Sequence, residues 1–255
     1  MRKFCVFCGK EPIDKNDEHV IPQWLIELTG NRTRLVNLGY LKGPEFGIRK
    51  FSFNSFVFPA CSKCNNDYGI LEKRAQPIIK KLLSFEEIAA HEFSWLLDWF
   101  DKVRVGIWLG HYYLDKNWLG INPRFAIGSR IGRYDRFIGI YRSPDLKKHL
   151  SFFGTESVSF AYMPSCFNLN INHLSFINVS AVNLFSRELG FPYYDLIQIK
   201  DEKTMKVHPY EPTGIISVPK LHDKLILKGT EIYQPMFSLD NSNEFQYLYL
   251  DDFVV

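Results

Sequence analysis

The sequence predicts an α+β fold in which a cysteine-rich N-terminal part is joined by a helical segment to a strand-rich C-terminal part. Between residues 70 and 115, apolar residues recur every three or four positions, as on one face of a helix. From residue 124 onward, short strand-like runs are separated by turn residues. Helices and strands in separate runs are typical of α+β proteins. The chain of 255 residues is long enough for two domains.

The elements divide the chain into three parts. We expect a first domain in residues 1–80, a helical connector in residues 81–120 and an α+β domain of unknown role in residues 121–255. In the first domain, short strands and long loops precede a helix that begins near Cys64. Pro77 predicts a break or kink in the helical segment, because proline lacks the backbone N–H that a helix uses.

The helical segment and the C-terminal part differ in their apolar pattern. The expected apolar helix face consists of Phe85, Ile88, Ala89, Phe93, Leu96, Leu97 and Phe100. In the C-terminal part, two strands flank a turn at residues 132–135. Later strands are expected at residues 158–163, 169–182, 194–199, 214–218 and 232–237, and residues 183–189 could form a short helix.

The positive charge of the chain lies in its N-terminal half. Residues 1–80 have 13 Lys and Arg against 8 Asp and Glu, and residues 81–150 have 11 against 8. Residues 151–255 have 7 against 12. Nucleic acid would therefore be attracted to the first 150 residues and repelled by the rest. A basic surface that is only solvated would give the same counts.

The sequence shows no feature of a membrane or exported protein. It lacks an uninterrupted apolar run of about 18 residues, and its N-terminus leads directly into a cysteine motif without a signal segment. We therefore expect a cytoplasmic protein with no membrane partner. Thiols stay reduced in that compartment, so paired cysteines are expected to bind metal rather than form disulfides.

Four of the five cysteines form two C-x-x-C pairs. These are Cys5 with Cys8 and Cys61 with Cys64. A two-residue gap lets both sulfur atoms of a pair reach one ion, so the two pairs predict one tetrahedral structural zinc. Gly9 follows the first pair and suits the positive φ that such a turn often needs. Cys166 stands alone and is expected to be a buried thiol.

Two short motifs accompany the cysteine pairs. Asp17-Glu18-His19-Val20-Ile21-Pro22 lies between the pairs, and Asn65-Asn66-Asp67 follows the second pair directly. In this order and spacing, residues 5–72 resemble the HNH endonucleases of the ββα-metal group, in the form with a four-cysteine structural zinc. The resemblance implies a ββα-metal, treble-clef-like domain that hydrolyses phosphodiester bonds in nucleic acid, with DNA as the expected substrate. It also implies Zn²⁺ as the structural cation and Mg²⁺ or Mn²⁺ as the catalytic cation.

The resemblance assigns roles to four residues. His19 matches the general base, Glu18 the acidic ligand of the catalytic metal, and Asn65 the last position of the motif, which is a metal ligand. Asn54 is the nearest candidate for the middle Asn, although it lies seven residues before Cys61, which is not the usual spacing. Asn65 could instead be only a helix N-cap, and Asn54 only a turn residue.

The chemistry of these residue types agrees with phosphodiester hydrolysis. A neutral His can take a proton from water near physiological pH, and a hard divalent cation takes oxygen ligands from carboxylate and amide groups. Asn66 and Glu72 are reserve candidates for the site. Lys63, Lys73 and Arg74 could contact phosphate groups or belong to an ordinary solvated surface.

Three functions stay open at this point. The first is a metal-dependent DNA endonuclease whose residues 121–255 select the substrate or bind a partner protein or ligand. The second is a non-catalytic zinc module that binds nucleic acid or protein. The third is a toxin or effector gated by a partner, because stand-alone HNH proteins with an unfamiliar second domain resemble antiviral defence and restriction components.

Overall fold

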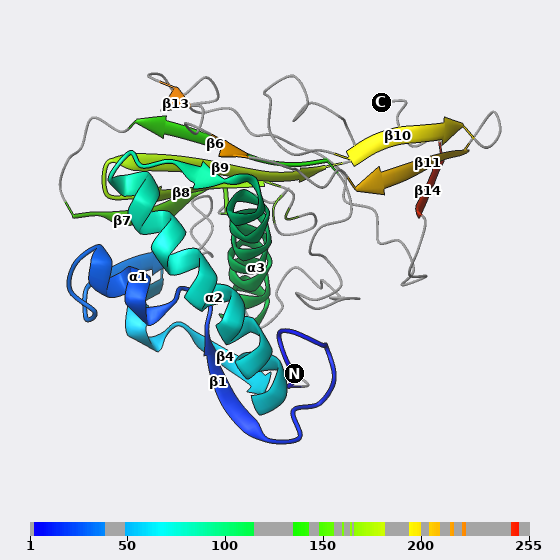
Figure 1. Cartoon of the computed structure of the whole chain (residues 1–255). Coiled ribbons are helices and arrows are strands. Elements are labelled where there is room, and N and C mark those ends of the chain that lie inside the picture. Colours follow the sequence, from blue (N-terminus) through cyan, green and yellow to red (C-terminus); the bar gives the residue numbers. More distant parts are fainter. Residues whose placement is uncertain are drawn as a thin grey trace, which may run out of the picture.

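The computed structural model describes most of the chain up to residue 181 and short segments beyond it (Figure 1). The described residues are 3–38, 49–114, 135–142, 148–155, 160, 164, 166–181, 194–199, 204–209, 215–216, 221–222 and 246–249. They form helices and several small sheets, so the expected α+β class is confirmed. Among them, no helix combines the length and the apolar character needed to cross a membrane.

The N-terminal part begins with an antiparallel strand pair followed by a helix. Strand β1, Lys15–His19, pairs with β4, Val57–Cys61, so that His19 lies opposite Val57. Side chains of β4 alternate between buried and half-buried, as expected for a strand with one face on the core. Helix α2, Ser62–Leu83, follows β4 without a loop. The order is therefore strand, strand, helix, with the cysteine pairs at the ends of this unit.

Shorter elements connect the two paired strands. They are α1 (Gln23–Leu28), β2 (Leu35–Leu38), β3 (Arg49–Ser52) and the 3-10 helix η1 (Phe53–Ser55). β2 and β3 form their own antiparallel pair, and η1 returns the chain to β4. In the described part of the 52 residues between the cysteine pairs, these elements lie between β1 and β4.

The helical segment contains two long helices, and its expected apolar face is wrong over residues 85–89. α2 begins at Ser62, near Cys64 as expected, and continues through Pro77 without the break that proline could have caused. Phe85 lies after the helix, exposed and with a left-handed φ of 58°. Ile88 and Ala89 form the short strand β5 and pair with β12, Ile215–Ile216. The regular apolar spacing across residues 85–89 therefore belonged to a turn and a strand, not to a helix.

Helix α3, Ala90–Leu114, is the central element of the structure. Most of its side chains from Phe93 onward are buried, and Figure 1 shows it beside α2 and under the larger sheet. Its apolar residues occupy all sides of the helix, which is typical of a helix enclosed by other elements. Lys102 and Arg104 are buried within it and need partners, because burying an unpaired charge is costly.

The larger sheet has the strand order β13-β6-β9-β8-β7. Its strands are β6 (Asp135–Arg142), β7 (Leu150–Phe153), β8 (Cys166–Ile171), β9 (Leu174–Ala181) and β13 (Leu221–His222). The single strand expected at residues 169–182 is wrong, since β8 and β9 form a hairpin. Asn172 at its turn has a φ of 53°, a conformation that Asn tolerates better than most residues.

A second sheet contains the remaining strands of the C-terminal part. β10, Tyr194–Ile199, pairs with β11, Thr204–Pro209, which pairs with β14, Gln246–Tyr249. The strand expected at residues 194–199 is confirmed, and the described part of the one expected at residues 214–218 forms β12. The turn at residues 132–135 and the strand at 158–163 lie mostly outside the described residues. The segments 183–189 and 232–237 lie wholly outside them.

Candidate functional site

The four paired cysteines come together at one end of the strand pair. The Sγ atoms of Cys5, Cys8, Cys61 and Cys64 all lie within 4.8 Å of one another. A tetrahedral zinc with bonds of about 2.3 Å would bring sulfur atoms to roughly 3.8 Å from each other, so a small contraction is sufficient. Among the described residues, this is the group of His, Cys, Asp or Glu side chains that could hold a metal ion such as zinc.

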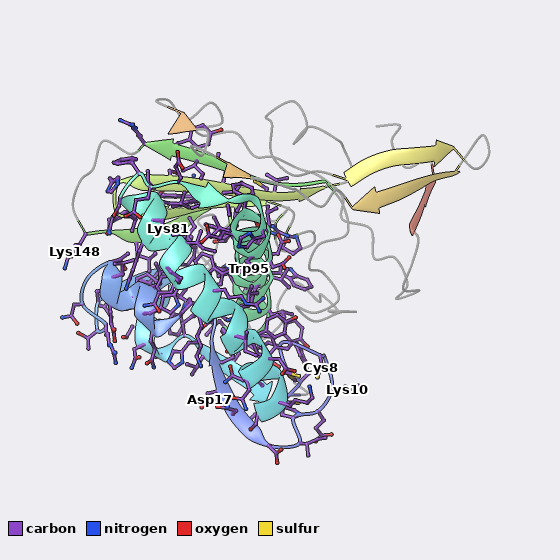
Figure 2. All side chains as sticks on the ribbon, viewed as in Figure 1. Cys8, Lys10, Asp17, Lys81, Trp95 and Lys148 are labelled. Carbon is purple, nitrogen blue, oxygen red and sulfur yellow. The ribbon has the colours of Figure 1, made fainter. Side chains whose placement is uncertain are left out.

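The first cysteine pair lies in a tight turn. The Cys5 N–H donates to the Lys10 carbonyl at 2.7 Å, and the Gly9 N–H donates to the Cys5 carbonyl at 2.8 Å. Gly9 has a φ of 72°, which confirms the expected role of glycine after the pair. Figure 2 shows Cys8 and Lys10 next to each other beside one end of α2. The turn thereby directs both sulfur atoms towards the second pair.

The second cysteine pair joins β4 to α2. Cys61 ends the strand and caps the helix, and Cys64 lies in the first turn of α2. The Cys61 N–H donates to the Cys5 Sγ at 3.3 Å, and the Val6 N–H donates to the Pro59 carbonyl at 3.0 Å. These bonds hold the two pairs in register, so the cluster is organised by the backbone as well as by the sulfur atoms.

The electrostatics of the cluster favour a bound cation. Burial and the neighbouring thiols of Cys5 and Cys8 raise the pKa of Cys64 to about 12. Four thiolates at this distance repel one another, and a cation is needed before all of them ionise. The donor set fits zinc, which binds thiolates in tetrahedral geometry.

His19 lies at the end of β1 and is half-buried. Its ring donates a hydrogen bond to the backbone carbonyl of Asn54, and its Nε2 atom lies 3.4 Å from Nε2 of Gln23. Burial lowers the pKa of His19 from its ordinary value, although the Asn54 carbonyl and nearby acids oppose this shift. The imidazole is therefore neutral at physiological pH and can accept a proton.

The two predicted Asn residues both lie close to β1. Asn54 belongs to η1, where its side chain is exposed and its backbone carbonyl holds the His19 ring. Asn65 lies on α2, and its Nδ2 atom is 3.5 Å from the Asp17 carbonyl. The alternative that Asn65 is the helix N-cap is wrong, because Cys61 occupies that position. His19 and Asn65 therefore lie in β1 and α2, and Asn54 lies in η1, where its carbonyl meets His19.

Glu18 belongs to a buried ionic cluster with Lys102 and Glu72. Its side chain is 5% exposed, and its Oε1 atom lies 2.5 Å from Nζ of Lys102. Lys102, which is 1% exposed, also forms an ion pair with Glu72 of α2, and its ammonium lies 5.7 Å from the Phe7 ring centre. The cluster thus joins β1, α2 and α3.

The charges of this cluster do not balance. Burial raises the pKa of Glu18 to about 7, because two carboxylates share one ammonium group away from water. Burial opposes the charge of Lys102, but the carboxylates of Glu72 and Glu18 outweigh it and raise the pKa of Lys102. Lys102 therefore stays a cation, and the excess negative charge is what binds a proton near neutral pH.

The arrangement of Glu18 does not fit a bound catalytic metal. The oxygen atoms that the resemblance assigns to a divalent cation are buried and already paired with the Lys102 ammonium group. The reserve candidate Glu72 shares the same ammonium group. The assignment of Glu18 and Asn65 to Mg²⁺ or Mn²⁺ stays a prediction, and in this arrangement the ammonium group holds the carboxylates.

Lys102 is the residue of the site that the sequence motifs did not indicate. A signal was nevertheless present, since the segment from Phe93 to Leu109 is apolar on every side of the helix. A lysine inside such a segment is buried whichever way the helix faces, so it needs acidic partners from elsewhere in the chain.

The three basic residues expected to contact phosphate all lie on α2. Lys63 is exposed and forms an ion pair with Asp67 at 2.8 Å. Lys73 is exposed, and the guanidinium of Arg74 lies 4.6 Å from the centre of the Trp95 ring. Their contact with nucleic acid stays a prediction.

No family model matches this sequence, and neither a curated protein nor a solved structure matches the chain. The functional assignment therefore rests on the residues and their geometry.

Proposed function

We propose that the chain is an endonuclease that hydrolyses phosphodiester bonds in nucleic acid, with His19 as the general base. The observation that supports this proposal most is the setting of His19. It ends the first of two antiparallel strands, its ring is held by the Asn54 carbonyl near the start of the second, and α2 follows with Asn65. A four-cysteine cluster lies at one end of the same two strands and helix.

The hydrogen bonding of His19 suits a base. A neutral imidazole that donates through one nitrogen keeps a lone pair on the other, and here the Gln23 amide nitrogen lies 3.4 Å from Nε2, so an attacking water molecule would take the place of this amide. Such a group can remove a proton from an attacking water molecule. Because burial lowers the pKa of His19, the base form persists to a lower pH than for a solvated histidine.

One observation favours a second candidate, the non-catalytic zinc module that binds nucleic acid or protein. The Glu18 carboxylate is paired with Lys102, so the acidic residue before His19 contributes to packing in this arrangement. A pure binding module would have the cysteine cluster and the basic residues of α2 and no hydrolytic activity. We also propose that the protein acts in defence or restriction and that residues 121–255 bind a partner protein or ligand.

The test is cleavage of a supercoiled plasmid and of single-stranded RNA by zinc-loaded protein, with and without Mg²⁺ or Mn²⁺. His19→Ala should lose about two to four orders of magnitude in rate, the usual contribution of a positioned base. His91→Ala is the matched control, since His91 is an exposed histidine on α3. The wild-type rate should fall only below about pH 6.5, where a histidine of lowered pKa becomes protonated.

Two results would decide against the nuclease. If His19→Ala cuts as fast as the wild type under conditions where the wild type is active, His19 is not the base. If no variant cuts any substrate with either metal while nucleic acid still binds, the zinc module is the better assignment.

A further inference from the structure

The face of α3 that carries Lys102 is built for close approach to the N-terminal strands. Lys102, Gly106 and Gly110 follow one another at four-residue intervals and therefore share one side of the helix. A Cβ atom on Gly106 would lie 2.9 Å from Val20, and one on Gly110 would lie 2.8 Å from Phe56. The two glycines allow α3 to lie directly against this part of the chain, and the same face carries Lys102 to Glu18.

Lys102 lies where a metal ion would be held by these carboxylates. Glu18 projects from β1 and Glu72 from α2, and the ammonium group of Lys102 contacts both. Carboxylate oxygens from a strand and a helix are the type of ligand that Mg²⁺ and Mn²⁺ take. Two acidic side chains with one buried cation between them have the composition of a metal site in which an ammonium group replaces the metal.

We propose that the ammonium group of Lys102 occupies the cation position between Glu18 and Glu72, so that a divalent metal ion binds these carboxylates only when Lys102 is displaced or removed. Lys102 would thereby control metal access at the site of the proposed function, a proposal that rests on that function only for the effect on cleavage. The geometry that supports it is the pairing of one buried lysine with both acids.

Competition between the two cations follows from charge and space. An ammonium group within ion-pair distance of both carboxylates repels a second cation and fills the volume that the metal would need. Mg²⁺ also gives up its water reluctantly, which disfavours entry into a buried position.

The experiment measures Mn²⁺ binding to the full zinc-loaded chain by electron paramagnetic resonance. Mn²⁺ does not compete with zinc for thiolates, so the cysteine cluster stays loaded. Lys102→Met should gain one Mn²⁺ site that binds at least about tenfold more tightly than any site of the wild type. Lys102→Met with Glu72→Gln should lose that site. Lys81→Met should behave as the wild type, because Lys81 is also an ion-paired lysine but its partner is Glu92.

A conservative variant covers the case in which Lys102→Met does not fold. Glu18→Gln retains the shape of the side chain, and Lys102 still pairs with Glu72. If Lys102 holds these acids, Glu18→Gln leaves the Mn²⁺ binding of the lysine-containing chain unchanged. Weakened binding in this variant would mean that Glu18 already coordinates metal, which would overturn the proposal. Equal Mn²⁺ affinity in folded Lys102→Met and wild type would overturn it as well.

The plasmid assay separates this proposal from the proposed function. If no variant cleaves nucleic acid but Mn²⁺ binding follows the expected pattern, the inference on Lys102 holds and the nuclease assignment fails. If the wild type cleaves and Lys102→Met requires the same metal concentration for half its maximal rate, Lys102 does not control metal access and the nuclease assignment stands.

Discussion

The cysteine cluster and the ionic cluster both join α2 to the N-terminal strands, but they obtain their positive charge differently. The cysteine cluster combines four groups that are neutral or negative, and its positive charge would come from a metal ion that binds from solution. The ionic cluster of Glu18, Glu72 and Lys102 carries its cation on a side chain. The charge balance of the cysteine cluster would therefore depend on the metal concentration, whereas that of the ionic cluster depends on the position of α3.

The two clusters lie at opposite ends of β1, the strand that carries His19. Zinc at Cys5, Cys8, Cys61 and Cys64 would fix the end of the strand pair at which α2 begins. Lys102 fixes the other end of β1, next to His19, by connecting it to the centre of α3. With zinc bound, the strand that carries His19 would be held at both ends by charge interactions of different origin.

The largest effect is expected from removing one zinc ligand. Structural zinc contributes about 10–16 kcal/mol of apparent binding free energy in small domains, so Cys64→Ala should lose the metal and the fold of residues 3–75. Zinc content and amide hydrogen exchange measure these two losses. Cys166→Ala, at the cysteine outside the cluster, should retain zinc and protection. Natively purified protein that is folded without zinc would contradict the prediction that the cysteine cluster needs a metal ion.

A smaller but still large effect is expected from removing the internal cation. Lys102→Met leaves two carboxylates without a partner, and breaking a buried ion pair from one side costs about 3–5 kcal/mol. Urea unfolding of zinc-loaded protein without Mn²⁺ measures this cost. Adding Glu18→Gln should recover part of the stability, because one uncompensated charge is removed. Lys63→Met removes an exposed pair, which solvent screens, and should leave the stability almost unchanged, so equal losses in the two variants would contradict the role of Lys102.

The pH dependence of stability tests the charge imbalance of the ionic cluster. Burial raises the pKa of Glu18 from 4.5 to about 7, so between these values the folded chain binds a proton that the unfolded chain has released. This contribution to the free energy of unfolding is present below pH 4.5 and is lost as the pH rises through about 7. The loss is at most ~3 kcal/mol. The difference between wild type and Glu18→Gln, measured by urea unfolding from pH 4 to 8, should follow this slope, and a constant difference would rule it out.

The smallest effect is expected from the glycine face of α3. Gly106→Ala places a methyl group against Val20 and should cost about 1–3 kcal/mol, because α3 and the Val20 side chain would have to move apart. Gly69→Ala in α2 meets nothing within 4 Å and should stabilise by about 0.5–1 kcal/mol through helix propensity. Thermal unfolding of the two variants should therefore shift in opposite directions. A stabilised Gly106→Ala would mean that close approach of α3 is not needed.

The two clusters were not equally accessible from the sequence. Cys5 and Cys8, like Cys61 and Cys64, are separated by two residues, and this spacing predicts a shared ion without knowledge of the fold. Glu18 and His19 were recognised as a motif. Adjacent residues of a strand point to opposite faces, and the sequence did not show that the face of Glu18 meets α3. Lys102 is far from Glu18 in the chain, so their contact depends on tertiary packing.

The secondary structure shows the same division between local and long-range information. The strand at residues 194–199 and the helical character of residues 70–115 follow from local pattern. The hairpin of β8 and β9 was missed because Asn172 and His173 form a two-residue turn without glycine or proline. Phe85 and Ile88 continue the apolar spacing of the helix, although the helix had already ended at Leu83. At Asn172 and at Phe85, the conformation of a turn, and not the apolar pattern, determined where the strand or the helix ends.

The separation of the cysteine pairs along the chain has a consequence for the unfolded protein. Cys5 and Cys61 are 56 positions apart, so a bound zinc closes a loop that contains β1, α1, β2, β3 and most of β4. A cross-link over a loop of this length removes about 4 kcal/mol of chain entropy from the unfolded state. α2 and α3 lie outside the loop and form from contacts that are near in sequence, so they can assemble first. Metal uptake would then be a late step of folding, and zinc supply would set how much of the protein has a completed site.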